Sequence, residues 1–107
     1  MIIVEFYSAR GSDAPAGFRV SGHTGVTGQS IVCAAVSSAC YMAANTITDI
    51  VGAKARVSES DGMMSVIVRN DDIPKAEVIL AGLALHLKQL TRQYPRQIRI
   101  KYSEVHQ

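Results

Sequence analysis

The sequence predicts an α+β domain with the element order ββαββαβ, in which two helices pack against one mixed or antiparallel sheet of about five strands. Short segments rich in β-branched and aromatic residues lie before, between and after two long segments whose apolar residues recur at helical spacing. The 107 residues contain no internal repeat, low-complexity tract or linker. We therefore expect residues 1–107 to form a single domain.

The first two strands are predicted over residues 2–7 and 18–22, and a polar loop with Gly11, Pro15 and Gly17 separates them. Residues 53–60 and 63–69 flank Asp61-Gly62, a strong signal for a tight hairpin turn. The last strand is predicted over residues 97–102, where apolar and basic residues alternate.

The first helix is predicted over residues 30–51, with Ser30 as its N-cap and Gly52 as its C-terminal stop. Its apolar or small residues at helical spacing are Val32, Ala35, Val36, Ala39, Ala43, Ile47 and Ile50. A helix that is apolar nearly all round is expected to be covered on most sides.

The second helix is predicted to begin near residues 70–72, before Pro74, and to end before Pro95. Its apolar stripe consists of Ala76, Leu80, Leu83, Leu87, Leu90 and Tyr94. Val78 and Leu85 lie away from that stripe. They fit either a subunit contact or a partly covered helix within one chain.

Composition indicates an ordinary folded protein, because 48% of the residues are hydrophobic and 19% are charged. The net charge of +2 is only mildly basic, which by itself names no partner. The first ten residues lack the features of a secretion signal, and no stretch of about 18 apolar residues occurs. We expect a cytoplasmic protein with no membrane segment.

The two cysteines, Cys33 and Cys40, lie seven residues apart on one predicted helix, which separates their Cα atoms by about 10 Å. That distance is too long for a disulfide. Neither a CxxC pair nor a Cys/His cluster at zinc spacing is present, so we expect no metal site and no cofactor.

Cys33 is the candidate nucleophile, because a thiolate forms more readily in the first turn of a helix and next to an imidazole. His23 lies ten residues upstream, in a glycine-containing segment that can bring its imidazole to the thiol. Cys40 is interpreted as an inert core residue. His86 and His106 have no comparable partner and are interpreted as a helix-flank and a tail residue.

The segment with His23, Gly28 and Ile31–Ser37 (IVCAAVS) resembles the bacterial ribosomal-processing cysteine proteases called Prp. The resemblance implies a small homodimeric endopeptidase in which Cys33 is the nucleophile and His23 its base. It also implies the substrate, a precursor of the large-subunit ribosomal protein of L27 type, whose N-terminal extension is removed. The family usually has an aspartate where this chain has Ser30, and a slightly longer segment between histidine and cysteine.

Several further residues are candidates for binding the peptide and stabilising the oxyanion. Backbone N–H groups at the helix start, with the N–H of Ser30 or the side-chain amide of Gln29, are candidate oxyanion donors. Gly22, Gly25 and Gly28 permit unusual backbone angles, and we expect the loop to order over an extended peptide. These glycines match no phosphate-binding motif, and structural turns explain them more simply than nucleotide binding does.

An alternative interpretation is a non-catalytic ribosome-associated or RNA-binding module, in which the same segment builds a binding loop and a buried helix. The basic residues Arg92, Arg96, Arg99 and Lys101 could then contact ribosomal RNA or an acidic partner. A solvated helix end and an exposed strand face explain these residues equally well.

Overall fold

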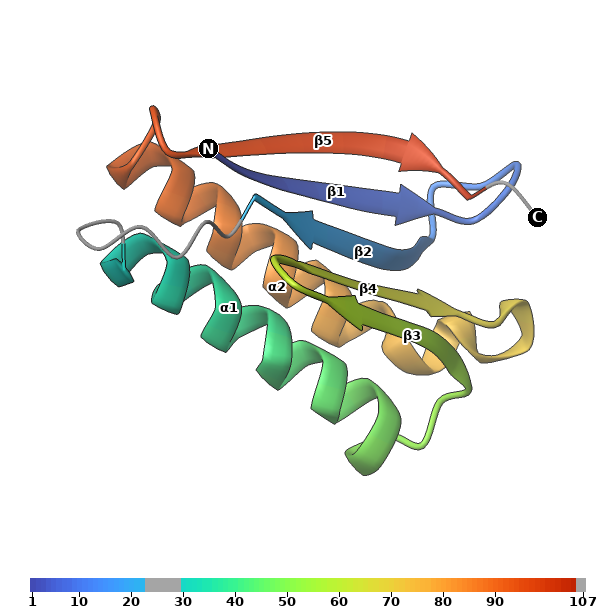
Figure 1. Ribbon diagram of the computed structural model, residues 1–107. Helices are drawn as coiled ribbons and strands as arrows, with labels where there is room; N and C mark the ends of the chain where they lie inside the picture. The colour runs from blue at the N-terminus through green and yellow to red at the C-terminus, as the bar shows by residue number, and fades with distance from the viewer. Residues whose placement is uncertain (23–29, 106–107) are drawn as a thin grey trace.

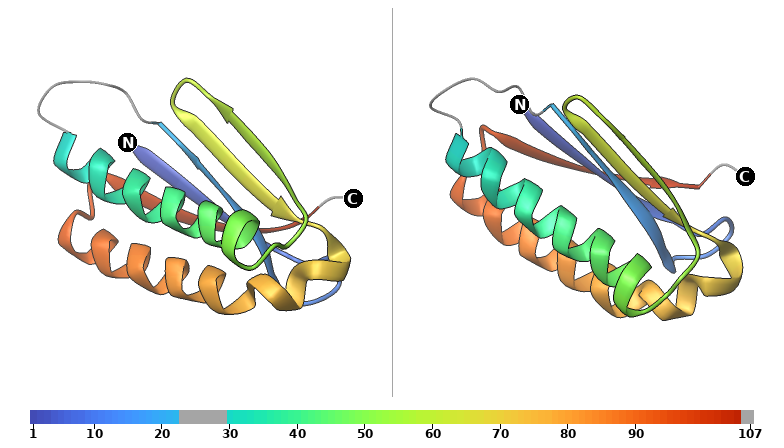
Figure 2. Two further views of the ribbon diagram at one scale, coloured as in Figure 1. Left: turned by 90° about the horizontal axis from the view of Figure 1, so that it is seen from below. Right: turned by 60° about the horizontal axis from the view of Figure 1, so that its bottom comes forward.

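Two helices lie side by side on one face of a five-stranded sheet (Figures 1 and 2). The computed structural model describes residues 1–22 and 30–105, with Ser30 described by its backbone. The elements are β1 (Ile2–Ser8), β2 (Pro15–Ser21), α1 (Ser30–Asn45), the π-helix η1 (Thr46–Ile50), β3 (Ala55–Ser60), β4 (Met63–Val68), the 3-10 helix η2 (Asn70–Asp72), α2 (Ile73–Gln93) and β5 (Ile98–Glu104). The predicted order ββαββαβ is confirmed.

The strand order in the sheet is β3-β4-β2-β1-β5. Neighbouring strands are antiparallel except β1 and β5, which run parallel. The sheet is therefore mixed, and α2 carries the chain from β4 past β2 and β1 to the edge strand β5. The backbone N–H of Ile2 donates to the carbonyl of Gln97 over 2.8 Å, which fixes the start of β1 beside the start of β5.

The core lies between the sheet and the two helices. Alternate strand residues turn toward the helices because successive side chains of a strand point to opposite faces. Fully buried side chains from both layers include Val4, Phe18, Val20, Val66, Val36, Cys40, Leu80 and Leu87. Burying an aliphatic or phenyl side chain of this size contributes about 1.5–3 kcal/mol.

The face of the sheet turned away from the helices is called the open face below. It carries the other set of alternate residues, of which Ser58, Ser65, Arg19, Glu5 and Lys101 pair with one another across its middle. No helix of the described residues covers it (Figure 2).

β2 begins at Pro15, within the segment that the sequence predicts as a loop. Proline is tolerated as the first residue of a strand, and the register shifts at this point between Tyr7 and Ser8. A Cβ atom at Gly17 would lie 2.1 Å from the carbonyl oxygen of Val66, so β4 approaches too closely for any other residue. The prediction was wrong here because Pro15 and Gly17, which resemble turn signals, are part of the strand.

α1 continues as a π-helix at Thr46, where the sequence predicts one uninterrupted helix. The hydroxyl of Thr46 donates to the carbonyl of Met42 over 2.7 Å, and that of Thr48 donates to the carbonyl of Ala44 over 3.1 Å. Such bonds compete with regular helix geometry. Gly52, with φ at +72°, ends the segment as predicted.

The outer side of α1 and η1 is uncovered in the single chain, which corrects the expectation that this helix is covered on most sides. Ile31 is 74% exposed and Ile50 is 80% exposed, and Met42 is also exposed. The sheet and α2 cover only the inner side, where Val36 and Cys40 are buried. By length and composition residues 31–50 could cross a membrane, a property shared by core helices of soluble proteins.

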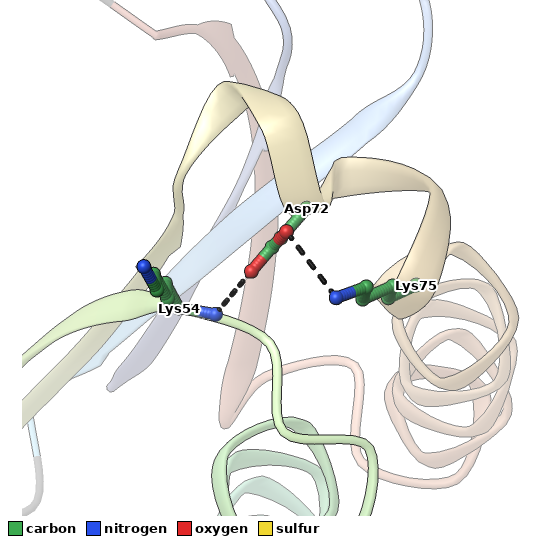
Figure 3. A network of polar contacts seen from close by, with 3 residues as sticks. All are labelled: Lys54, Asp72 and Lys75. Atoms are coloured by element: carbon green, nitrogen blue, oxygen red, sulfur yellow. Dashed lines mark hydrogen bonds and ion pairs between the residues drawn. The ribbon is translucent and has the colours of Figure 1, made fainter.

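α2 buries the predicted stripe, with Ala76, Leu80, Leu83 and Leu87 in the core and Leu90 and Tyr94 packed against it. Its start is tied to the segment before β3 by Asp72 (Figure 3). The backbone N–H of Lys54 donates to the Asp72 carboxylate over 2.7 Å, and Lys75 Nζ lies 3.5 Å from the other oxygen. The hydrogen bond from Lys54, aided by the charge of Lys75, lowers the pKa of Asp72 against the effect of desolvation.

Candidate active site

Cys33 lies in the first turn of α1, as the sequence predicts, and is half-buried at the edge of the core. The first N–H groups of a helix have no intrahelical partner and carry partial positive charge. The first turn of α1 contains no acidic residue that would oppose a thiolate. Cys33 therefore combines partial access with a favourable electrostatic position.

A small hollow of about 50 Å³ adjoins Cys33. Among the described residues its lining is formed by Met1, Ile2, Arg96, Gln97 and Cys33. The hollow thus lies where the starts of β1 and β5 meet the start of α1. No local sequence pattern singles out Met1, Ile2 and Gln97 as neighbours of Cys33. The parallel pairing of β5 with β1 brings Gln97 to Met1 and Ile2 at this hollow.

Gly22 is the last described residue before His23, and it lies at this same end of the sheet, beside the start of β1. Its φ is +88°, a conformation that favours glycine. A Cβ atom at Gly22 would lie 2.2 Å from the carbonyl oxygen of Met1, which itself lines the hollow beside Cys33. Gly22 is therefore required by the geometry that directs the chain out of β2 near the candidate nucleophile.

The other predicted site residues in this segment, His23, Gly25, Gly28 and Gln29, lie outside the described residues. Ser30 is the first residue of α1, and its predicted capping contact rests on a side chain outside the description. The roles assigned to these five residues remain predictions.

Cys40 lies two turns further along α1 and differs sharply from Cys33. It is 0% exposed, and desolvation raises the pKa of its thiol to about 12. Such a thiol stays protonated at neutral pH and is a poor nucleophile. The structure therefore leaves Cys33 as the accessible thiol of the two.

The basic residues singled out in the sequence do not form one patch. Arg99 and Lys101 alternate with Ile98 and Ile100 of β5 and lie on the open face, whereas Arg92 is exposed in the last turn of α2. Arg96 lies beside the hollow at Cys33. His86 is exposed on α2, as its interpretation as a helix-flank residue requires.

Within the described ranges, no three His, Cys, Asp or Glu side chains gather in a way that could hold a metal ion.

The family model for the cysteine protease Prp matches residues 1–99. The chain belongs to the Prp family of cysteine proteases. The predicted family and the prediction of a cysteine-type peptidase are thereby confirmed, and the Prp assignment decides against a non-catalytic module. No curated protein matches this Prp chain.

Solved structures share the Prp fold across nearly the whole chain. The essential ribosomal processing protease Prp from S. aureus, in complex with a substrate peptide, is 21% identical with a TM-score of 0.83. The same protease with a covalently linked product peptide is 21% identical with a TM-score of 0.80. In both comparisons the match covers 95% of this chain and 99% of the other.

A protein from Streptococcus mutans also shares the fold. It is 22% identical with a TM-score of 0.78, and the match covers 98% of this chain and 96% of the other. At these identities the likeness extends to the fold and does not by itself assign residues to roles.

Proposed function

We propose that this Prp family member is a ribosomal processing endopeptidase that removes the N-terminal extension of a large-subunit ribosomal protein precursor of L27 type. The observation that carries the proposal is the position of Cys33. It is a half-buried cysteine in the first turn of α1, beside a hollow, in a chain whose family is that of cysteine proteases. The fold neighbours that are ribosomal processing proteases support a ribosomal precursor as the substrate.

In this proposal the reaction is acyl transfer through a Cys33 thioester. His23 takes the thiol proton, and the Cys33 sulfur attacks the scissile carbonyl carbon. The resulting imidazolium protonates the amine as the peptide bond breaks, which releases the downstream fragment. Water then attacks the thioester with His23 as its base, and the carboxylate leaves as the thiol re-forms.

The start of α1 supplies the electrostatic part of the mechanism. Its unpaired N–H groups favour the thiolate of Cys33 and can donate to the oxyanion of the tetrahedral intermediate. The N–H of Ser30 and the side-chain amide of Gln29 are the further donors in this proposal. Because Ser30 replaces the aspartate usual in the family, no carboxylate at this position holds the imidazolium, and the ion pair depends on the helix terminus instead.

The peptide itself must bind outside the hollow at Cys33. With a volume of about 50 Å³, the hollow admits a small group but no polypeptide segment. His23 follows Gly22 in the chain, and Gly22 packs against Met1 at the rim of this hollow. The position of Cys33 supports a substrate path across the starts of β1 and β5.

We further propose that the enzyme is a cytoplasmic homodimer. Both cysteines are free, which fits a compartment that keeps thiols reduced. On α2, Val78 is 86% exposed and Leu85 is 59% exposed, and residues seven apart lie on the same side of a helix. The small residues Ala81 and Gly82 lie between them and permit close approach of a second chain.

The decisive experiment is incubation with a ribosomal protein precursor of L27 type that carries its natural extension, followed by mass spectrometry of the product. We expect one cut by the wild type and by the core variant Cys40→Ala, and no cut by Cys33→Ser. His23→Ala should slow cleavage by about 10²- to 10⁴-fold, the usual contribution of a general acid-base group. Cleavage by Cys33→Ser at the wild-type rate would refute the mechanism. If the wild type leaves this precursor uncut but cleaves another ribosomal protein precursor, the proposed substrate is wrong.

A further inference from the structure

The open face of the sheet concentrates positive charge. Arg19 on β2, Arg56 on β3, and Arg99 and Lys101 on β5 are all exposed. The strand register places them on the open face, because Arg56 pairs with Ile67 of β4, Arg19 and Lys101 pair with Glu5 of β1, and Arg99 pairs with Ile3. Arg69 directly follows β4 in extended backbone and lines the same hollow as Arg56 and Ile67. The open face therefore carries five of the chain's eleven Lys and Arg residues.

Negative charge is nearly absent from the same positions. Of the nine Asp and Glu residues in the chain, only Glu5 occupies an open-face position on the strands. Asp71, which lines the same hollow as Arg69, is the second carboxylate at this face. The rest of the chain then holds six cationic residues and seven carboxylates, so its net charge is negative while that of the open face is positive. None of the five open-face cations forms an ion pair with a described residue.

These cations are spread across the sheet and do not converge on one point. β3 and β5 are its two edges, four strand spacings or about 19 Å apart, so Arg56 and Lys101 cannot grip one small anion. On the strands between these edges, Ser65 of β4 and Ser21 of β2 have short side chains that do not project far from the sheet. A hollow of about 470 Å³ at the β3–β4 side is lined by Arg56, Arg69 and Ile67 together with Ala55, Asn70 and Asp71. The geometry suits an extended polyanion.

Apolar surface lies among the charges on the same face. Tyr7 and Ile3 of β1 flank Glu5 along the strand, and both are half-buried. Ile67 lies on β4. Proteins that bind single-stranded nucleic acid without sequence preference combine cations for the backbone with aromatic and apolar surface for the bases.

We propose that the open face binds the phosphate backbone of single-stranded RNA, with Arg19, Arg56 and Lys101 as the central contacts. This surface lies on the side of the sheet opposite the helices, and the proposal does not depend on the proteolytic function. The cations neutralise phosphates and release counterions, so affinity must fall as salt rises.

Glu5 gives the proposal an unusually sharp test. It pairs across the strands with Arg19 on one side and Lys101 on the other. The Tyr7 hydroxyl donates to one of its carboxylate oxygens over 3.1 Å, and the Ser103 hydroxyl donates to the other. A fixed negative charge in the middle of the binding surface repels phosphate, so its removal should strengthen binding.

The experiment measures binding of the full-length chain to a fluorescently labelled 20-nucleotide poly(U) RNA by fluorescence anisotropy at 50 and 200 mM KCl. If three cations contact phosphates, log K against log salt has a slope near −2, and affinity falls about 20-fold between the two concentrations. Arg19→Gln and Lys101→Gln should each reduce the slope by about 0.7. Glu5→Gln should bind about threefold more tightly, the effect expected of one exposed charge.

Arg92→Gln is the matched control, because it removes one exposed charge from α2 on the helix side of the molecule and should leave binding unchanged. Cys33→Ser should bind RNA as the wild type does. Circular dichroism confirms that each variant is folded. The proposal is overturned if the wild type does not bind at 50 mM KCl, if Arg92→Gln weakens binding as much as Arg19→Gln, or if folded Glu5→Gln binds more weakly. Displacement of RNA by poly-L-glutamate at equal charge concentration would identify an acidic protein surface as the partner and also overturn it.

Discussion

At the scale of single residues, Cys33 and Cys40 show how position decides the chemistry of one side-chain type. They lie on the same helix, yet Cys33 lines a hollow and Cys40 is enclosed by the core. The sequence could predict this difference, since Cys33 follows the helix start and Cys40 continues the apolar spacing of Val36 and Ala43. It could not predict Arg96 and Gln97 beside Cys33, because no local pattern reveals which strand β5 pairs with.

Gly22 provides the residue-scale prediction. Gly22→Ala introduces a Cβ atom 2.2 Å from the carbonyl oxygen of Met1 in a backbone with φ at +88°. We expect a loss of about 2–5 kcal/mol in the free energy of unfolding, from the left-handed conformation together with overpacking. Equilibrium unfolding in urea measures this loss of stability. Where the protein remains folded, cleavage should also fall, because the residue before His23 is displaced.

Gly11→Ala is the control for Gly22→Ala. Gly11 has a similar φ of +72°, but a Cβ atom there meets nothing within 4 Å. Its cost should be limited to the conformational strain of about 1–2 kcal/mol. Equal losses of unfolding free energy in the two variants would show that the steric conflict with Met1 does not add to the cost of Gly22→Ala.

At the scale of elements, helical periodicity predicted both helices and the alternating pattern predicted most of the strands. The errors have local causes. Pro15 and Gly17 resemble a turn, although one starts β2 and the other allows the close approach of β4. Thr46 and Thr48 donate to main-chain carbonyls of α1, and there the helix widens into η1.

Asp72 provides the element-scale prediction, because it joins the start of α2 to the segment before β3. Its pKa is lowered in the folded protein, chiefly by the hydrogen bond from the Lys54 N–H. The stabilisation is therefore complete above the unfolded pKa near 3.8 and is lost as pH falls through the lower folded value. Asp72→Asn should lower the melting temperature at pH 7, and its difference from the wild type should shrink near pH 2.

Thermal unfolding followed by circular dichroism at both pH values measures this effect. Asp71→Asn is the matched control, since Asp71 is exposed in the same 3-10 helix, whereas the Lys54 N–H donates to Asp72. A melting temperature of Asp72→Asn equal to that of Asp71→Asn at pH 7 would contradict the assigned role.

At the scale of the whole molecule, our proposals assign proteolysis and RNA binding to opposite sides of the sheet. The helix side holds the core and, at one end, Cys33, whereas the open face presents cations to a polyanion. The sequence could predict the amphipathic β5 with Arg99 and Lys101, but not that Arg19 and Arg56 join them. That grouping depends on the strand order β3-β4-β2-β1-β5, which places residues distant in the chain on one surface.

The proposed homodimer is the prediction at this scale. Sedimentation velocity of the wild type should give twice the 11.5 kDa mass of one chain. Val78→Lys should shift the population to monomer, because it places a charge in the apolar contact on α2. Ile50→Lys is the control, since Ile50 is 80% exposed on η1. Dissociation by Ile50→Lys and not by Val78→Lys would move the interface from α2 to the outer side of α1 and η1.

The contact between Gly22 and Met1 has a practical consequence for anyone who produces this enzyme. Residues fused ahead of Met1 would emerge at the rim of the hollow beside Cys33, where an affinity tag would crowd the nucleophile. β5 runs parallel to β1, so its end at Glu104 lies at the far end of the sheet (Figure 1). A purification handle belongs after the last residue, and preparations tagged at the front should regain turnover once the tag is cut away.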